Sequence, residues 1–166
     1  MFERDIISQL AAWKTDTNRK PLVVHGARQV GKTWALKYFG REYFDDVAYF
    51  SLDKDESGLC DVFRTTKDPQ RIIQHLSFLH GKKIEPQTTL LILDEIQECN
   101  EALNALKYFC EEAPEYAVAC AGSLLGIYLN HVGKSFPVGK VNHLYMYPLT
   151  FTEFLRTKDP VMHEYM

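Results

Sequence analysis

A glycine-rich octapeptide sets the strongest limit on how this chain can fold. It reads GARQVGKT, runs from Gly26 to Thr33, and matches the pattern G-x-x-x-x-G-K-[ST]. The run LVV at 22–24 before it is short, apolar and β-branched, which favours a buried strand. Residues 32–43 after it carry apolar side chains at helical spacing. A strand, this loop and a helix in that order predict a phosphate-binding loop, because the flanking elements disfavour the alternative of a glycine-rich turn that binds nothing.

Each residue type in this phosphate loop (residues 26–33) has a chemical reason to be there. Glycine lets backbone N–H groups curl around a phosphate because no Cβ stands in the way, and the following helix directs its N-terminus at the same anion. Lys32 brings a positive charge to the β and γ phosphates, and the Thr33 hydroxyl can ligate Mg²⁺. We expect the nucleotide to be contacted by Gly26, Ala27, Arg28, Gln29, Val30, Gly31, Lys32, Thr33 and Trp34.

A second site is expected where the apolar run LLIL at 90–93 ends in Asp94 and Glu95. An acid at the carboxyl edge of a parallel sheet lies where open α/β folds bind ligands. Asp94 could hold Mg²⁺, directly or through a water, and Glu95 could polarise an attacking water. Two acids could instead cap the next helix, but the phosphate loop upstream favours the functional interpretation.

A third polar group follows the predicted strand 116–121. Ser123 could contact the γ-phosphate or the attacking water, and capping of a helix that begins at Leu124 explains it equally well. Gln97 lies two residues after Glu95 and could join the same cluster.

Strands and helices alternate along the chain, which predicts an α/β fold. Because helices separate the strands, we expect parallel strands joined by crossover connections. An aromatic group, Tyr145, Tyr147, Phe151 and Phe154, is interpreted as core, since too few basic residues interleave it for a nucleic-acid platform. The expected helices are 4–13, 32–43, 69–81, 100–112 and 150–156, and the expected strands are 22–24, 47–52, 90–93, 116–121 and 141–147.

Composition narrows the class of protein further. The 166 residues suit one domain, and 46% hydrophobic with 25% charged residues is typical of a globular chain. A net charge of −3 excludes a strongly basic nucleic-acid binder and gives no electrostatic reason to adsorb to a membrane. The four cysteines form no C-x-x-C pair, and the N-terminus lacks the pattern of a signal peptide. We therefore expect free thiols and a cytoplasmic protein.

Four stretches together resemble the prokaryotic AAA-type P-loop ATPases, ATP-binding proteins in which a C-terminal domain of unknown function follows the P-loop domain. They read PLVVHGARQVGKT, LLILDEIQ, CAGSLLG and SFPVGKVNHLYMYPLTFTEFL, and the resemblance spans essentially the whole chain. It implies a P-loop NTPase three-layer sandwich with a mostly parallel five-stranded core sheet, ordered 5-1-4-3-2. It also implies Asp94 as the Walker B acid, Glu95 as catalytic base and Ser123 as sensor.

The leading hypothesis is an ATP-binding, Mg²⁺-dependent ATP hydrolase module. Its expected catalytic residues are Lys32, Glu95 and Ser123, and its expected metal residues are Thr33 and Asp94. The alternative is a nucleotide-gated switch with negligible turnover. A GTPase is disfavoured, because the chain lacks D-x-x-G after the second strand motif and lacks N-K-x-D.

The resemblance also bears on domains and partners. Relatives continue beyond the position of Met166, so residues 1–166 are expected to be a single AAA-type nucleotide-binding domain and the N-terminal fragment of a longer protein. The expected partners are ATP or ADP and the missing C-terminal domain, with a homo-oligomer left open. Nothing in the sequence indicates nucleic acid or membrane as a partner.

Overall fold

A five-stranded sheet in which all paired neighbours are parallel forms the centre of the molecule. The computed structural model describes residues 4–53, 58–123 and 139–164. The strand order is β2-β3-β4-β1-β5, which is 5-1-4-3-2 from the opposite edge, so the predicted fold class and order are confirmed. The strands are β1 (Leu22–His25), β2 (Asp46–Ser51), β3 (Thr89–Asp94), β4 (Ala117–Gly122) and β5 (Asn142–Tyr145).

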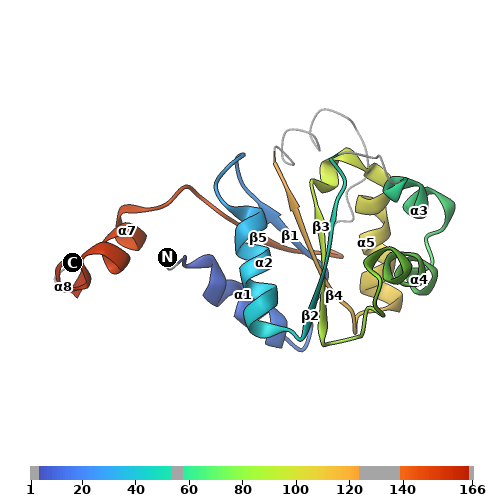
Figure 1. The fold of residues 1–166 in the computed structure, drawn as a ribbon, viewed down its shortest axis with the longest axis horizontal. Helices are drawn as coiled ribbons and strands as arrows, with labels where there is room; N and C mark the ends of the chain where they lie inside the picture. The colour runs from blue at the N-terminus through green and yellow to red at the C-terminus, as the bar shows by residue number, and fades with distance from the viewer. Residues whose placement is uncertain (1–3, 54–57, 124–138, 165–166) are drawn as a thin grey trace.

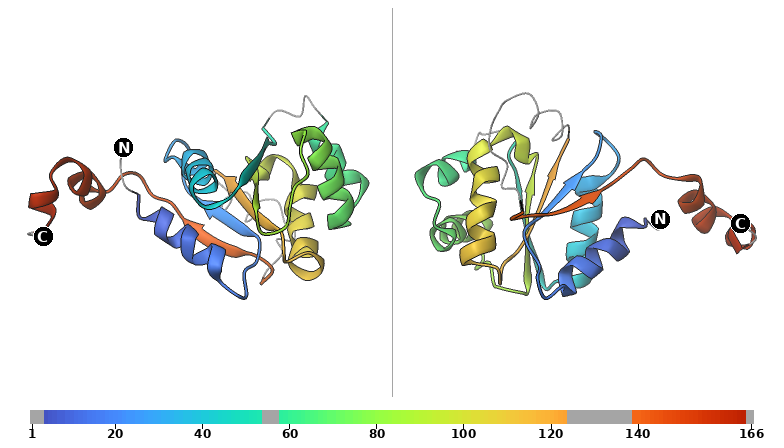
Figure 2. Two further views of the ribbon diagram at one scale, coloured as in Figure 1. Left: turned by 60° about the horizontal axis from the view of Figure 1, so that its bottom comes forward. Right: turned by 180° about the vertical axis from the view of Figure 1, so that it is seen from behind.

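Helices cover both faces of the sheet, which makes three layers (Figures 1 and 2). Helices α1 (Ile6–Thr15) and α2 (Lys32–Tyr43) lie on one face. Helices α3 (Leu59–Thr65), α4 (Pro69–His80) and α5 (Asn100–Glu112) lie on the other. Helices α7 (Phe151–Lys158) and α8 (Pro160–Glu164) extend away from the sandwich. None of the helices in the described ranges combines the length and the apolar character needed to cross a bilayer.

Alternation of side chains along β3 explains why both faces need cover. Leu90 and Ile92 pack in the core with α1 and α2, whereas Leu91 and Leu93 pack in the core with α3, α4 and α5. Successive strand residues point to opposite faces, so a strand that is apolar at every position is buried on both sides. Every residue of β3 is buried accordingly.

Two helix starts follow the capping signals in the sequence. The Asp68 side chain accepts a hydrogen bond from the Gln70 N–H, with Pro69 at the first helical position of α4. Thr150 and Glu153 form a reciprocal capping box at α7, with hydrogen bonds of 3.1 and 2.9 Å. The short helices α3 and α8 were not expected from the periodicity, and β5 is shorter than the predicted strand 141–147.

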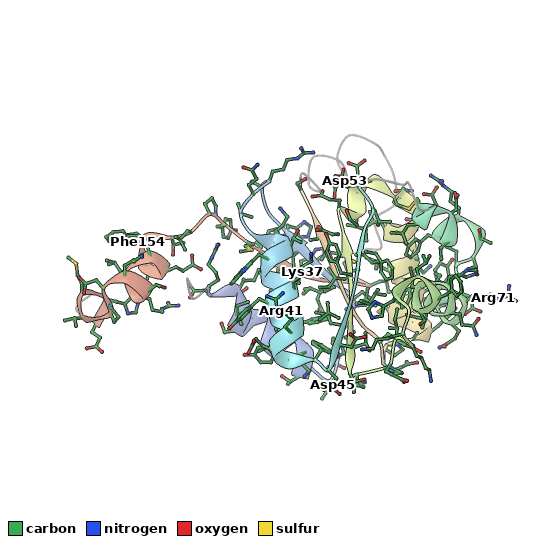
Figure 3. All side chains as sticks on the ribbon, viewed as in Figure 1. Lys37, Arg41, Asp45, Asp53, Arg71 and Phe154 are labelled. Atoms are coloured by element: carbon green, nitrogen blue, oxygen red, sulfur yellow. A yellow bond between two sulfur atoms is a disulfide. The ribbon has the colours of Figure 1, made fainter. Side chains whose placement is uncertain are left out.

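The prediction that four aromatic residues near the C-terminus belong to the core is wrong. Tyr145, Tyr147, Phe151 and Phe154 are 56%, 67%, 64% and 41% exposed. Strand β5 is an edge strand with one paired neighbour, and α7 carries Phe154 away from the sandwich (Figure 3). These side chains therefore lack the second layer that would bury them.

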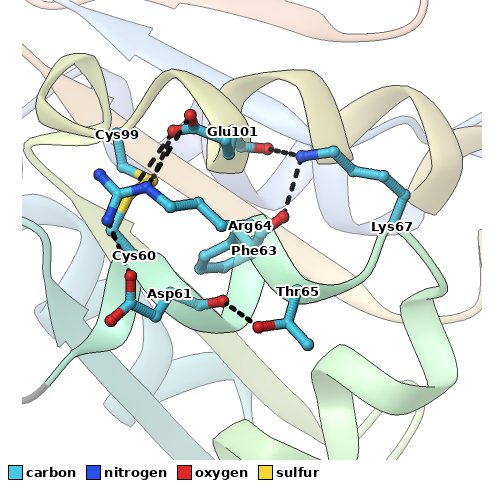
Figure 4. The surroundings of a disulfide bond; sticks show 8 residues. All are labelled: Cys60, Asp61, Phe63, Arg64, Thr65, Lys67, Cys99 and Glu101. Carbon is cyan, nitrogen blue, oxygen red and sulfur yellow. Dashed lines mark hydrogen bonds and ion pairs between the residues drawn. A yellow bond between two sulfur atoms is a disulfide. The ribbon is translucent and has the colours of Figure 1, made fainter.

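The prediction of free thiols is wrong for two cysteines. Cys60 in α3 and Cys99 just before α5 form a disulfide, while Cys110 and Cys120 are free (Figure 4). The two residues are 39 apart in sequence, but α3 and α5 pack on the same face and bring their Cα atoms to 5.9 Å. Spacing in the sequence carries no sign of this contact. The expectation of a cytoplasmic location loses the support it drew from free thiols.

Candidate nucleotide-binding site

The carboxyl ends of three adjacent strands meet at one edge of the sheet. Strand β1 leads into the phosphate loop, β3 ends at Asp94, and β4, which lies between them, leads to Ser123. The crevice outside the carboxyl ends of parallel strands is where open α/β sheets bind ligands. The three polar groups expected from the sequence thus come from one edge.

Glycine is required at both ends of the phosphate loop, for different reasons. A Cβ on Gly26 would lie 2.4 Å from the carbonyl oxygen of Met146, so any side chain at this position would clash with the backbone of Met146. Gly31 has φ +99° and precedes α2, where its carbonyl accepts from the N–H of Ala35 at 2.9 Å. Residues other than glycine rarely adopt that backbone conformation. A residue with a side chain would therefore be strained at either position.

Lys32 lies inside the curve of the loop and is 7% exposed. Its ammonium donates to the carbonyl oxygens of Gly26 at 2.8 Å and Ala27 at 2.6 Å. Burial lowers the pKa of Lys32, and the nearby carboxylates of Glu95 and Asp94 act in the opposite direction. A positive charge is thus placed between the loop and the two acids.

Three hydrogen-bond donors hold the Asp94 carboxylate. Its Oδ2 accepts from the Thr33 hydroxyl and from the Tyr49 hydroxyl, both at 2.7 Å, and its Oδ1 accepts from the Glu95 N–H at 2.9 Å. Asp94 is only 4% exposed. The structure therefore brings together Thr33 and Asp94, the two residues expected to hold a metal ion.

Glu95, Gln97 and Ser123 form a polar cluster beside Asp94. The Gln97 amide donates to Glu95 Oε2 and lies 3.5 Å from Ser123 Oγ, and Ser123 donates to the same Glu95 oxygen at 3.4 Å. Glu95 has φ +52°, a left-handed conformation that costs a residue with a side chain about 1–3 kcal/mol. The alternative role of Ser123, capping of a helix beginning at Leu124, concerns residues outside the described ranges.

A cleft of about 420 Å³ opens beside these groups. Trp34, 37% exposed, stacks on Tyr38 at its rim, with ring centroids 5.2 Å apart. Val30 does not line the cleft, because its side chain is buried in the core under α2. The lining residues are Arg28, Gln29, Gly31, Lys32, Thr33, Trp34, Asp53 and Glu95.

Residues 18–155 match a family model described as AAA domain. The chain belongs to the AAA domain family. A search of curated proteins found no match.

Solved structures agree with the fold of this AAA domain. The Aeropyrum pernix ORC1 protein in complex with DNA is 14% identical, with a TM-score of 0.53 over 91% of this chain and 45% of that one. The Pif1 helicase from Bacteroides, in complex with ADP-AlF3 and ssDNA, is 16% identical, with a TM-score of 0.50 over 89% of this chain and 42% of that one. The chain spans less than half the length of these two proteins, and at such identities the likeness concerns the fold alone.

The residues of this AAA domain fit a nucleotide with a magnesium ion. A hydroxyl and a carboxylate, Thr33 and Asp94, supply hard oxygen donors of the kind Mg²⁺ prefers. Gly31, which adopts a conformation that favours glycine, and the adjacent Lys32 suit phosphate oxygens.

Sequence reasoning missed two side chains at this edge, Tyr49 and Asp53. Strand β2 pairs with β3 so that Ser51 lies opposite Asp94, and Tyr49 lies two residues earlier. Asp53 follows the same strand and lines the cleft; Figure 3 labels it at this end of the sheet. Polar residues near the end of the strand next to the Asp94 strand were the available signal.

Proposed function

We propose that this AAA domain binds ATP with Mg²⁺ and hydrolyses it to ADP and phosphate. The observation that carries the proposal is the hydrogen bond between Thr33, at the start of α2, and Asp94, at the end of β3. The proposal is supported further by the sequence neighbours of these two residues, since Lys32 precedes Thr33 and Glu95 follows Asp94. The proposal that residues 1–166 are the N-terminal part of a longer protein rests on the family resemblance alone.

Each side chain has a role in this reaction. Lys32 and the loop N–H groups bind and orient the β and γ phosphates, since phosphoryl transfer depends on positioning and charge neutralisation. Thr33 and Asp94 would hold Mg²⁺, which when bound neutralises charge on the phosphate oxygens. Glu95 takes a proton from the water that attacks the γ-phosphorus, while the bond from that phosphorus to the β–γ bridging oxygen breaks and ADP leaves.

Gln97 and Ser123 orient the base in this scheme. Both donate toward Glu95 Oε2, which fixes the carboxylate at the edge of the cleft. The same contacts favour a second candidate function, a nucleotide-gated switch, because two donors already occupy the Glu95 oxygen that would otherwise face the attacking water. Turnover would then be negligible although ATP binds.

Substitution of Glu95 by glutamine tests the proposal. Glu95→Gln keeps size and hydrogen bonding but cannot accept a proton, so we expect turnover to fall by about 10²–10⁴-fold with ATP affinity nearly unchanged. Glu98→Gln, an exposed acid three residues further on, is the matched control. Phosphate release and calorimetry measure the two quantities. Wild-type turnover in Glu95→Gln would refute the role of Glu95, and ATP binding without turnover in every variant would favour the switch.

A further inference from the structure

Tyr49 contacts the candidate metal site from an element that carries none of its expected residues. Its hydroxyl donates to Asp94 Oδ2 at 2.7 Å, the same oxygen that accepts from Thr33. Strand β2 pairs with β3 in a register that places Tyr49 opposite Ile92, two residues before Asp94 along β3. The length of the tyrosine side chain spans this offset, so that its hydroxyl meets the carboxylate.

A lysine on α2 holds the ring of Tyr49. Lys37, one helical turn after Thr33, places its Nζ 3.8 Å from the centroid of the Tyr49 ring. A cation over an aromatic face is attracted by the ring quadrupole, which restrains the orientation of the ring. Figure 3 labels Lys37 on α2. Helix α2 therefore acts on Asp94 twice, directly through Thr33 and indirectly through Lys37 and Tyr49.

We propose that Tyr49 is a positioning residue that fixes the Asp94 carboxylate for Mg²⁺. This role rests on the proposed function. With Thr33 and Tyr49 both donating to Oδ2 and Glu95 N–H donating to Oδ1, the carboxylate has one orientation. Without the Tyr49 hydroxyl, Oδ2 loses one of its two donors and the side chain gains freedom. Partners that orient metal-binding groups typically contribute 10–100-fold to metal affinity.

The test is the Mg²⁺ dependence of nucleotide binding. Tyr49→Phe removes the hydroxyl and keeps the ring under Lys37. Mg²⁺ is titrated into protein with a fluorescent ATP analogue, and binding of the analogue is also measured in EDTA. We expect Tyr49→Phe to need about 10–100-fold more Mg²⁺ for half-maximal response, with its affinity in EDTA equal to that of the wild type. Tyr43→Phe, an exposed tyrosine at the far end of α2, is the control and should match the wild type.

A second variant separates positioning from packing. Lys37→Met leaves the hydroxyl in place but removes the cation over the ring, so the Mg²⁺ requirement should rise by a smaller factor than in Tyr49→Phe. An equal loss of affinity in EDTA and in Mg²⁺ would mean general damage and would overturn the role of Tyr49. A Mg²⁺ response of Tyr49→Phe within twofold of the wild type would overturn that role alone. If nucleotide binding by the wild type does not depend on Mg²⁺, both the proposed metal function and the role of Tyr49 are overturned.

Discussion

His25, the residue before the phosphate loop, is a half-buried histidine whose environment disfavours its charged form. Its Nε2 lies 2.8 Å from Nδ1 of His143, and its ring stacks on the rings of His143 and Tyr145. Burial, and secondarily the charge of His143, lower the pKa of His25 to about 4. The strand end next to the loop is therefore sensitive to acid.

The pH dependence of unfolding tests this environment. Above the unfolded-state pKa of about 6.5, His25 is neutral in both states and has no effect. As pH falls below that value, the unfolded chain binds a proton that the folded chain does not bind until about pH 4, so the free energy of unfolding falls across that window. Urea unfolding at pH 7 and pH 5 should show the loss, and His25→Gln should reduce it. Equal pH dependence in both proteins would contradict the assignment.

At the residue scale, the sequence predicted the phosphate loop and the two acids, but it did not predict that Tyr49 hydrogen-bonds to Asp94. The sequence motifs identify the chemistry of four residues without a structure: Lys32, Thr33, Asp94 and Glu95. Tyr49 belongs to no recognisable motif, because its hydrogen bond to Asp94 depends on the register between β2 and β3. The register depends on how whole strands pack, so it cannot be predicted from a single sequence.

At the scale of elements, local signals set the boundaries well. Helix α2 has the predicted bounds, and α4 differs from the prediction by one residue, because caps and apolar spacing act within a few residues. Helix α3 has seven residues and begins after Gly58, which is too short for a periodic signal. The predicted burial of Tyr145 in β5 and Phe154 in α7 was wrong, since burial depends on which element packs against these side chains.

Further contacts between the α3 region and α5 lie beside the disulfide. Glu101, at the start of α5, lies 3.6 Å from Cys60 Sγ and 3.9 Å from the Arg64 guanidinium of α3, and its backbone carbonyl accepts from Lys67 at 3.2 Å (Figure 4). Cys99 lies four residues after Glu95. The disulfide therefore ties α3 to the segment that follows the candidate base.

Reduction of the Cys60–Cys99 disulfide should destabilise the fold. A cross-link across 39 residues removes chain entropy from the unfolded state, and the chain-entropy model predicts about 4 kcal/mol, within the typical 2–4 kcal/mol. Urea unfolding with and without a reducing agent measures the difference in free energy of unfolding. The double variant Cys60→Ser/Cys99→Ser is the control and should ignore the reducing agent. An oxidised protein that is no more stable than the reduced one would contradict the prediction.

At the scale of the whole molecule, the phosphate loop is continuous with both cores. It follows β1, whose Val23 and Val24 pack on opposite faces of the sheet, and Lys32 begins α2. Arg4, which precedes α1, also donates to the carbonyl of Val30 in the loop at 3.3 Å and to Glu153 of α7 at 3.1 Å. A ligand held by this loop binds only the folded chain, so its binding energy adds to global stability.

Stabilisation by ATP therefore reports on Lys32. At a nucleotide concentration 100 times the wild-type dissociation constant, linkage predicts a gain of about 2.7 kcal/mol in the free energy of unfolding. Loss of a hydrogen bond from a charged group costs about 1.5–3 kcal/mol, so Lys32→Ala should bind about 10–100-fold more weakly. At the same concentration the variant should gain only about 0.4–1.4 kcal/mol. Lys83→Ala, which removes an exposed lysine on the loop before β3, should gain as much as the wild type. Urea unfolding with and without Mg²⁺-ATP measures all three proteins, and an equal gain in Lys32→Ala and the wild type would mean that the ammonium does not hold the phosphates.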